Sequence, residues 1–360
     1  MRGWRNAFRA LGATFHVANP KDSGFRDFIS DNVYDIVMGY SGVGIENLPL
    51  QLLNSRNTAL VINGLPFNSS HSSPDIQAPC ADPMEVDFIS KFNIKIVWSQ
   101  WSPIYLNTYY SGYVAAGIPI LCLPYAGDIL TDVIESRDLD TTQSKILFVG
   151  NLSHRRRGNI PLIRKLMNLV PPEHLKIYGG DDWKELLGLD TKPTQPDTDI
   201  NGLYRSSLVC PNIHTTRQKQ RGIQLNDRTF NIAAAGAFQI CDNPLVGDYY
   251  SKDEIVCADN DIEYIEKVEF FLRHPEATLP YTVAALKRTY RDHSYFNRIA
   301  AIYESLSISD FVGIGDECWK PFRASAESVP SITFSQHTQY AAETKFMAIG
   351  RYFRKRLFKH

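Results

Sequence analysis

The sequence predicts an α/β protein of two domains, each built around its own parallel β-sheet. The chain has 360 residues, which is too long for one compact core and suits two. Short apolar runs alternate with amphipathic helical patterns from residue 4 to residue 306, and such alternation produces parallel strands covered by helices on both faces. An acidic, polar stretch at 126–144 breaks the pattern, so we interpret it as the connection between the two domains.

The first series of elements precedes this connection. Residues 4–12 carry apolar side chains three and four positions apart and stop at a glycine, which is the pattern of an amphipathic helix with a glycine cap. A second helix is predicted at 24–32. The predicted strands are short apolar runs bounded by turn residues, at 13–18, 34–40, 58–64, 94–100 and 118–124.

A second strand–helix series follows the connection. Its predicted strands are the apolar runs at 145–151, 174–180, 207–213 and 236–241. Its predicted helices lie at 157–170, within 225–236, at 261–275 and at 281–306. In the helix at 157–170 we expect Ile160, Ile163 and Met167 to share one face. The predicted domains are therefore 1–140 and 141–310.

The remaining residues, 311–360, are predicted to be an extension that ends in a basic amphipathic helix at 341–360. Phe346, Ile349, Phe353 and Leu357 share one face of this helix, and basic residues surround them. A helix of this kind lies on an anionic membrane surface or packs back on the first domain, and both interpretations stay open.

Composition and charge exclude several classes of function. The 44% of hydrophobic and 21% of charged residues are typical of soluble globular proteins. The net charge of −1 gives no global positive field for nucleic acid. No apolar run is long enough to span a bilayer, and residues 1–12 lack the apolar core of a signal peptide. The six cysteines form no CxxC pair, which predicts free thiols and a cytoplasmic location.

One arginine stands at the start of a helix rich in small residues. Arg228 precedes a run of alanines that ends at Gly236, and the apolar strand at 236–241 follows. Ligands of open parallel sheets bind beyond the carboxyl ends of the strands, and a helix start there favours phosphate. Arg228 is therefore a candidate for a bidentate contact to a diphosphate. A surface cation beside ordinary helix packing is the alternative.

Two neighbouring strand ends support the phosphate interpretation. Gly150 and Asn151 end the strand at 145–151, and the basic cluster Arg155–Arg157 begins four residues later. Gly179 and Gly180 end the strand at 174–180, where the absence of side chains lets a base or ribose approach the backbone. The sequence thus predicts a nucleotide-diphosphate pocket at these strand ends.

In addition, residues 145–306 resemble the donor-binding domain of the "group 1" glycosyltransferases, specifically the spore-maturation CgeB-like set. The shared motifs are a strand ending in "FVG", an arginine-bearing helix start, a strand ending in "YG", an "R.FE..A.G" block and a final helix. Residues that match this ordered series are Tyr204, Ser207, Asn212, Ile213, Arg228, His293, Tyr295 and Arg298. The first half resembles the N-terminal domain of the same family through "W..AF..LG", "YDIVMG" and "LPYAGD".

This resemblance implies the GT-B architecture, in which two Rossmann-like domains with parallel sheets face each other across a cleft. It implies that the second domain binds a UDP- or GDP-sugar as substrate and that the first binds a glycan, lipid-linked or protein acceptor. Neither a cofactor nor a metal is implied, because helix ends and basic side chains neutralise the leaving diphosphate. The donor-binding residues would be Gly150, Asn151, Arg155, Arg157, Tyr178, Gly179, His214, Asp227, Arg228 and Asn231.

Two features depart from the family. Asn231 stands where the family often has a glutamate that contacts the donor. The family's first strand would precede residue 3, so we expect this strand to be missing. The first domain offers His16, His71, Asp75 and Asp128 as candidates for the base that activates the acceptor hydroxyl, and we favour His71 and Asp75.

The sequence therefore predicts a metal-independent, hexosyltransferase-like glycosyltransferase. Two alternatives stay open, and the departures from the family favour the first of them. One is a non-catalytic glycosyltransferase-like subunit that binds a partner. The other is a sugar-nucleotide epimerase of the same fold.

Overall fold

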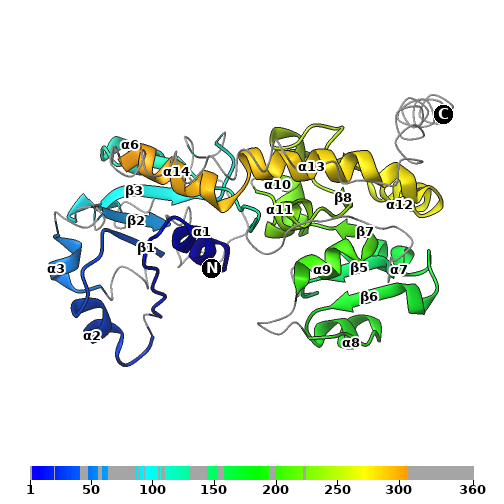
Figure 1. Ribbon diagram of the computed structural model, residues 1–360, viewed down its shortest axis with the longest axis horizontal. Coiled ribbons are helices and arrows are strands. Elements are labelled where there is room, and N and C mark those ends of the chain that lie inside the picture. Colours follow the sequence, from blue (N-terminus) through cyan, green and yellow to red (C-terminus); the bar gives the residue numbers. More distant parts are fainter. Residues whose placement is uncertain are drawn as a thin grey trace. The chain divides into compact units, whose positions relative to one another are not determined.

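The chain forms two compact α/β units (Figure 1). The computed structural model describes residues 2–19, 21–40, 48–55, 59–63, 86–87, 90–92, 94–103, 106, 110–129, 144–152, 158–193, 199–221 and 224–306. The first unit comprises Gly3–Pro124 together with the last described helix, from Phe296 onward. The second unit comprises Tyr125–Tyr295. The predicted domain boundary at residue 140 and the C-terminal extension lie outside the described residues.

The first unit is built on a parallel sheet in the order β1-β2-β3-β4. These strands are β1 (Ile36–Tyr40), β2 (Ala59–Asn63), β3 (Ile94–Ser99) and β4 (Ile120–Cys122). The described helices that accompany them are α1 (Arg2–Ala10), α2 (Phe25–Ser30), α3 (Leu50–Leu53) and α6 (Ser111–Ala115). Each of these four strands lies within an apolar run predicted to be a strand.

The prediction of a strand at 13–18 is wrong, because residues 13–19 form no ladder with a strand. The aromatic side chains of this segment pack against helices instead. The Phe15 ring stacks on Phe8 of α1, with 5.5 Å between the ring centroids. His16 contacts the ring of Phe28 in α2, at 5.6 Å. The apolar pattern here reflects contacts with helices, and Val17 is left 57% exposed.

The helix predicted at 281–306 is two helices, α13 (Leu279–Asp292) and α14 (Tyr295–Leu306). The helical hydrogen bonds stop between them because the backbone pairs with Gly127. Gly127 N donates to His293 O at 2.8 Å, and Tyr295 N donates to Gly127 O at 3.3 Å. Beyond this break the chain returns to the first unit. There Ile302 of α14 is fully buried in a core cluster with Val61, Ile96, Trp98 and Leu123.

The second unit is built on a parallel sheet in the order β6-β5-β7-β8-β9. Its strands are β5 (Ser144–Val149), β6 (Leu175–Tyr178), β7 (Ser207–Asn212), β8 (Gln239–Cys241) and β9 (Val256–Cys257). Its α-helices, besides α13, are α7 (Ile160–Met167), α8 (Asp182–Leu187), α9 (Ile200–Arg205), α10 (Thr216–Arg221), α11 (Asp227–Ala234) and α12 (Asp261–Arg273). The predicted fold class, α/β with two separate parallel sheets, is confirmed.

The strand order reverses between β5 and β7. From β5 the chain first adds β6 on one side and then returns to add β7 on the other side. Such a reversal is a topological switch point, where the loops that leave two adjacent strands diverge and open a crevice at their carboxyl ends. The carboxyl ends of β5 and β7 are therefore the edge at which sheets of this topology bind their ligands.

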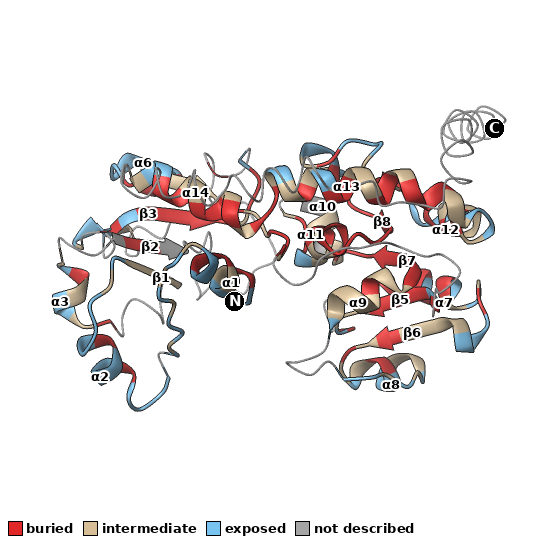
Figure 2. Cartoon of the chain, in the orientation of Figure 1, coloured by how far each residue is buried: buried red, intermediate tan, exposed pale blue. Residues whose placement is uncertain are grey.

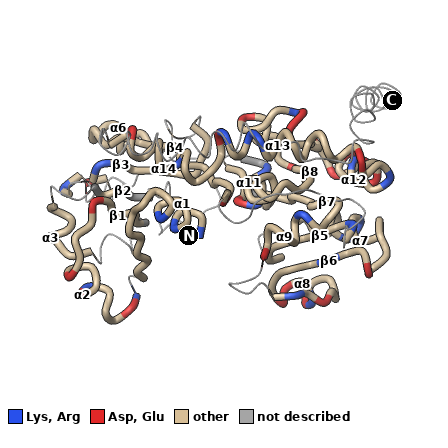
Figure 3. The backbone as a smooth tube through the Cα atoms, viewed as in Figure 1, with Lys and Arg blue, Asp and Glu red and all other residues tan. Residues whose placement is uncertain are grey.

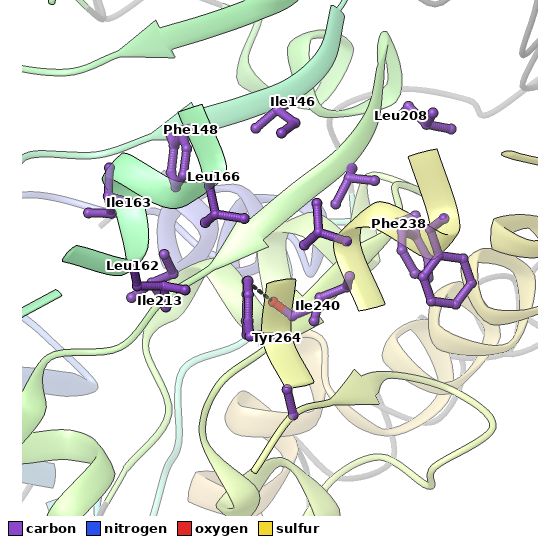
Figure 4. Close-up of a cluster of buried hydrophobic side chains, with 14 of the residues drawn as sticks. Ile146, Phe148, Leu162, Ile163, Leu166, Leu208, Ile213, Phe238, Ile240 and Tyr264 are labelled. Carbon is purple, nitrogen blue, oxygen red and sulfur yellow. Dashed lines mark hydrogen bonds between the residues drawn. The ribbon is translucent and has the colours of Figure 1, made fainter. Parts of the chain in front are cut away.

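A dense apolar core holds the second sheet in place (Figures 2 and 4). In α7 the buried residues are Leu162, Ile163 and Leu166, so the inward face is rotated from the predicted row of Ile160, Ile163 and Met167. Tyr264 of α12 is buried and donates its hydroxyl hydrogen bond to Ile240 O at 2.6 Å. This bond joins α12 to the middle residue of β8.

Two further observations concern the described residues only. Cys122, Cys210, Cys241 and Cys257 form no disulfide bonds. No helix in the described ranges combines the length and the apolar character needed to cross a membrane.

Candidate functional site

The candidate site is the carboxyl edge of the second sheet, which we define as the ends of β5, β6, β7 and β8 with the residues that follow them and the start of α11. Eight of the predicted donor-binding residues belong to these segments: Gly150, Asn151, Tyr178, Gly179, His214, Asp227, Arg228 and Asn231. The other two, Arg155 and Arg157, lie outside the described residues. So do His71 and Asp75, the predicted catalytic residues of the first domain.

Arg228 joins the two strands of the switch point. Its Nη1 donates to Val149 O, the last residue of β5, at 3.2 Å. Its Nη2 donates to Ile213 O, directly after β7, at 2.6 Å. The Nε is buried and has no hydrogen-bond partner among the described residues. Among the described residues, no carboxylate forms an ion pair with this guanidinium.

The start of α11 is set by a side-chain cap. Asn226 is the N-cap, and its Oδ1 accepts from Thr229 N at 3.1 Å. Asn and Asp at this position satisfy a backbone N–H that the helix leaves unpaired. Arg228 follows two residues later, within the first turn, so the cap fixes where its side chain leaves the helix. Asp227 is exposed beside it, and Asn231 lies one turn further along the same face as Asp227.

A network of buried side-chain hydrogen bonds holds the capping residue Asn226 in place. Asn212 at the end of β7 is fully buried. Its Nδ2 donates to Thr229 Oγ1 at 2.8 Å and to Gln239 Oε1 at 2.9 Å. Its Oδ1 accepts from Asn226 Nδ2 at 2.8 Å. The network therefore ties β7 and β8 to the start of α11, the helix that carries Arg228. Figure 3 shows that β7 and β8 carry no charged residue.

His214 and Asp242 form a second polar pair on the same edge. His214, after β7, is fully buried, and its Nδ1 lies 2.8 Å from Asp242 Oδ1. Asp242, after β8, also accepts from the backbone N of His214 at 2.8 Å. Lys219 of α10 is 3.1 Å from the other carboxylate oxygen. Sequence reasoning predicted His214 but gave Asp242 and Lys219 no role, because 28 residues separate His214 from Asp242.

The protonation of this pair follows from its surroundings. Burial lowers the pKa of His214 and outweighs the opposing effect of Asp242. Burial alone would raise the pKa of Asp242, but the hydrogen bonds from His214 and the charge of Lys219 bring it below the usual value. An ionised carboxylate only accepts hydrogen bonds. Nδ1 of a neutral His214 therefore carries the proton, and Nε2, which is buried with no partner among the described residues, is an acceptor.

This pair predicts acid lability. The unfolded chain binds a proton at His214 near pH 6.5, the ordinary pKa of histidine, whereas the folded chain binds it only at lower pH. The contribution of His214 to the free energy of unfolding is therefore full above pH 6.5, and it falls as the pH drops below this value. Asp242 adds a further loss, in the same direction, below pH 3.8. Thermal unfolding measured between pH 8 and pH 5 should show the decline.

His214→Asn is the informative variant, since its amide nitrogen replaces the Nδ1–H donor to Asp242 and does not titrate. We expect a smaller loss of melting temperature between pH 7 and pH 5 than in the native chain. His274→Asn, at a side chain that is 52% exposed, controls for the loss of a histidine. An unchanged slope in His214→Asn would contradict the assignment.

The end of the edge formed by β5 and β6 is shaped by glycines. Gly150 has a φ of 131°, which favours glycine, and its carbonyl accepts from Trp183 Nε1 at 2.8 Å. A Cβ on Gly179 would stand 2.4 Å from Gly150 O and 2.7 Å from Trp183 Nε1. Internal packing alone therefore requires glycine at 179. Asn151 is exposed and accepts from Gly180 N at 2.8 Å, while Tyr178 is half-buried.

Two residues of the last motif shared with the glycosyltransferase family, His293 and Arg298, contact backbone carbonyls of this chain. His293 Nε2 lies 2.8 Å from Tyr249 O, and Arg298 Nε donates to Pro124 O at 2.9 Å. Within the described ranges, no group of three or more His, Cys, Asp or Glu side chains is arranged to hold a metal ion.

The comparisons with known proteins concern mainly the second unit. A family model described as "Glycosyl transferase-like" matches residues 155–304, fewer than half of the 360 residues. This range contains Arg228, His214 and Asp242, so the region that carries the candidate site is similar to that family. No curated protein matches the chain.

Solved structures are similar at low sequence identity. TarM is 11% identical over 70% of this chain and 55% of its own, with a TM-score of 0.45. HepE from Anabaena in complex with UDP-glucose is 15% identical over 70% of this chain and 72% of its own, also at 0.45. MnaA from S. aureus with UDP is 8% identical over 85% of this chain and 87% of its own, at 0.42. The chain thus spans little more than half the length of TarM.

Proposed function

We propose that this chain is a metal-independent glycosyltransferase that binds a nucleoside-diphosphate sugar at the carboxyl edge of the second unit. It transfers the sugar, a hexose or a similar one, to a glycan, lipid-linked or protein acceptor. The observation that carries the proposal is Arg228, whose guanidinium bridges Val149 O and Ile213 O at the topological switch point. The glycosyl transferase-like match over residues 155–304 supports the class of reaction.

The chemistry of Arg228 suits a diphosphate. A guanidinium has five N–H groups, and the two carbonyls use one on each terminal nitrogen. The second N–H on each terminal nitrogen and the full positive charge would be available to phosphate oxygens, which bind arginine through charge-assisted bonds. The first turn of α11 adds backbone N–H groups and the positive end of the helix dipole. Lys219 supplies a second cation on the same edge, shared with Asp242.

In the transfer step, these groups stabilise the leaving diphosphate. Negative charge grows on the diphosphate as its bond to the sugar breaks, and fixed cations and N–H groups lower the energy of that state without reorganising. Asp227 and Asn231 would hold hydroxyls of the ribose or sugar. The neutral Nε2 of His214 would accept a hydroxyl hydrogen, and the predicted Arg155 and Arg157 would add charge.

The acceptor side of the proposal rests on the resemblance of the first half of the chain to the N-terminal domain of the same family. The first unit would bind the acceptor, with His71 or Asp75 as the base that removes the hydroxyl proton. Contact of the 341–360 segment with a membrane stays a prediction and would serve a lipid-linked acceptor.

A donor panel tests the proposal. UDP-, GDP-, CMP- and dTDP-sugars are each added to the native chain, and the melting temperature is recorded. We expect one nucleotide class to raise it, since a ligand at 100 times its dissociation constant stabilises by about 2.7 kcal/mol, or several degrees. Product analysis then looks for the free nucleoside diphosphate, released by transfer or by slow hydrolysis. Binding without release would support a non-catalytic subunit, and no binding would contradict the proposal.

A further inference from the structure

The second sheet places two cysteines side by side. Cys241 ends β8 and Cys257 ends β9, and they are paired in the parallel register. Paired residues of neighbouring strands point to the same face, and both side chains here pack in one apolar cluster with Phe230 and Tyr250. Neighbouring strands lie about 4.8 Å apart, which is inside the range of about 4.4–6.8 Å between the Cα atoms of disulfides. A disulfide between the two residues therefore fits the sheet.

The two thiols have different surroundings. Cys241 is fully buried, and its sulfur lies 3.6 Å from Asn243 O and 3.9 Å from His214 Nδ1. Burial raises the pKa of Cys241. Cys257 is only half-buried. A hydrogen bond from Cys241 lowers the pKa of Cys257, and the charge of Lys267 acts in the same direction.

The region around Cys257 also contains groups that oppose its ionisation. Burial and the carboxylates of Asp259 and Asp242 raise the pKa of Cys257, but the net shift is downward. Lys267 of α12 is held in place, because it donates to the backbone carbonyl of Cys257 and forms an ion pair with Glu263 at 2.7 Å. The thiolate is the reactive form of cysteine. Cys257 is therefore the nucleophile of the pair, and Cys241 is the resolving cysteine that closes the disulfide.

We propose that Cys241 and Cys257 form an oxidisable dithiol, a modification site in which peroxide oxidises Cys257 first and Cys241 then closes a disulfide. In the first step the Cys257 thiolate attacks one oxygen of hydrogen peroxide, the O–O bond breaks, and water leaves after protonation. The product is a sulfenic acid, Cys257–SOH. In the second step the Cys241 sulfur attacks the Cys257 sulfur, the S–O bond breaks, and a second water leaves. Peroxide is the oxidant, and the two thiols together lose two electrons.

The disulfide would bear on the candidate site because Asp242 directly follows Cys241. Closing it ties the strand end that carries Asp242 to β9, and it removes the S–H that lies beside His214.

Peptide mapping tests the proposal. The full-length chain is prepared with Cys80→Ser and Cys318→Ser. This protein is treated with hydrogen peroxide, alkylated with iodoacetamide and digested with trypsin without reduction. Lys252 separates the two cysteines, so a disulfide joins peptide 229–252 to peptide 253–267. We expect this cross-linked pair, lighter by two hydrogens than the sum of its parts, to become the main form of both peptides.

The chain supplies its own control. Cys122 is half-buried like Cys257, but burial raises its pKa to about 11, so it should stay alkylatable under the same treatment. In Cys241→Ser, dimedone should trap the sulfenic acid on Cys257. In Cys257→Ser, Cys241 should stay unoxidised. Oxidation of Cys122 as fast as that of Cys257, or a native chain in which peroxide forms no cross-link, would overturn the proposal without bearing on donor binding.

Discussion

The Arg228→Ala variant is expected to lose the thermal stabilisation that a nucleoside-diphosphate sugar gives to the native chain. Alanine removes the charge and every N–H group that faces the phosphates. Hydrogen bonds to a charged group contribute about 1.5–3 kcal/mol each, so losing two of them weakens binding at least about 100-fold. The fold itself should survive with a moderately lower melting temperature, because the carbonyls of Val149 and Ile213 each lose a single donor.

Two further variants separate charge from geometry. Arg228→Lys keeps the charge but lacks the planar fork that spans two strand ends and a diphosphate, so its affinity should fall between the native chain and Arg228→Ala. Arg273→Ala removes an exposed arginine of the same unit, which pairs with Glu269 at 2.6 Å, and it should bind as the native chain does. Titration calorimetry with the donor found in the panel measures all three. Undiminished binding by Arg228→Ala would place the phosphates elsewhere.

Of the variants proposed here, Asn212→Ala is expected to lower the free energy of unfolding most. Asn212 is fully buried and makes three hydrogen bonds, to Thr229, Gln239 and Asn226. Alanine leaves these partners without it, and an unsatisfied buried polar group costs about 1–3 kcal/mol. We expect the free energy of unfolding to fall by at least about 3 kcal/mol. Donor binding should weaken as well, because Asn226 caps the helix that carries Arg228.

Asn260→Ala is the matched control. Asn260 also caps a helix, α12, and accepts from Ile262 N and Glu263 N, each at 3.1 Å, but it is exposed. Its loss should cost about 1 kcal/mol and leave donor binding unchanged. Urea unfolding of both variants gives the comparison. If Asn212→Ala cost no more than Asn260→Ala, the buried network would not hold the site together.

The sequence predicts strands best where an apolar run is bounded by turn residues. The runs at 145–151, 174–180 and 207–213 became β5, β6 and β7, because a strand covered on both faces leaves little choice of side chain. The same apolar pattern misled at 13–18, where Phe15 packs on α1 and forms no ladder. At 13–18 the apolar residues stay half-buried or exposed, so an apolar run does not by itself establish a strand.

The candidate site is harder to predict from the sequence than the strands are. The sequence makes Arg228 a candidate because a helix start and a following strand bracket it. Asp242 was not given a role, since its contact with His214 depends on β7 and β8 being neighbours. The break at His293 was missed because its cause, the backbone of Gly127, lies far away in the chain. Contacts made through strand order leave no local pattern to detect.

The return of α14 to the first unit has a consequence for how the chain is made. Ile302 fills the core of a sheet whose last strand ends at Cys122. A ribosome that adds about 5–20 residues each second needs roughly 10–40 seconds to pass from β4 to α14. During that interval the second unit is synthesised and has time to fold, whereas the first lacks one of its core helices. The unit synthesised first is therefore the one completed last, and the nascent chain must keep its apolar sheet face from aggregating until the helix emerges.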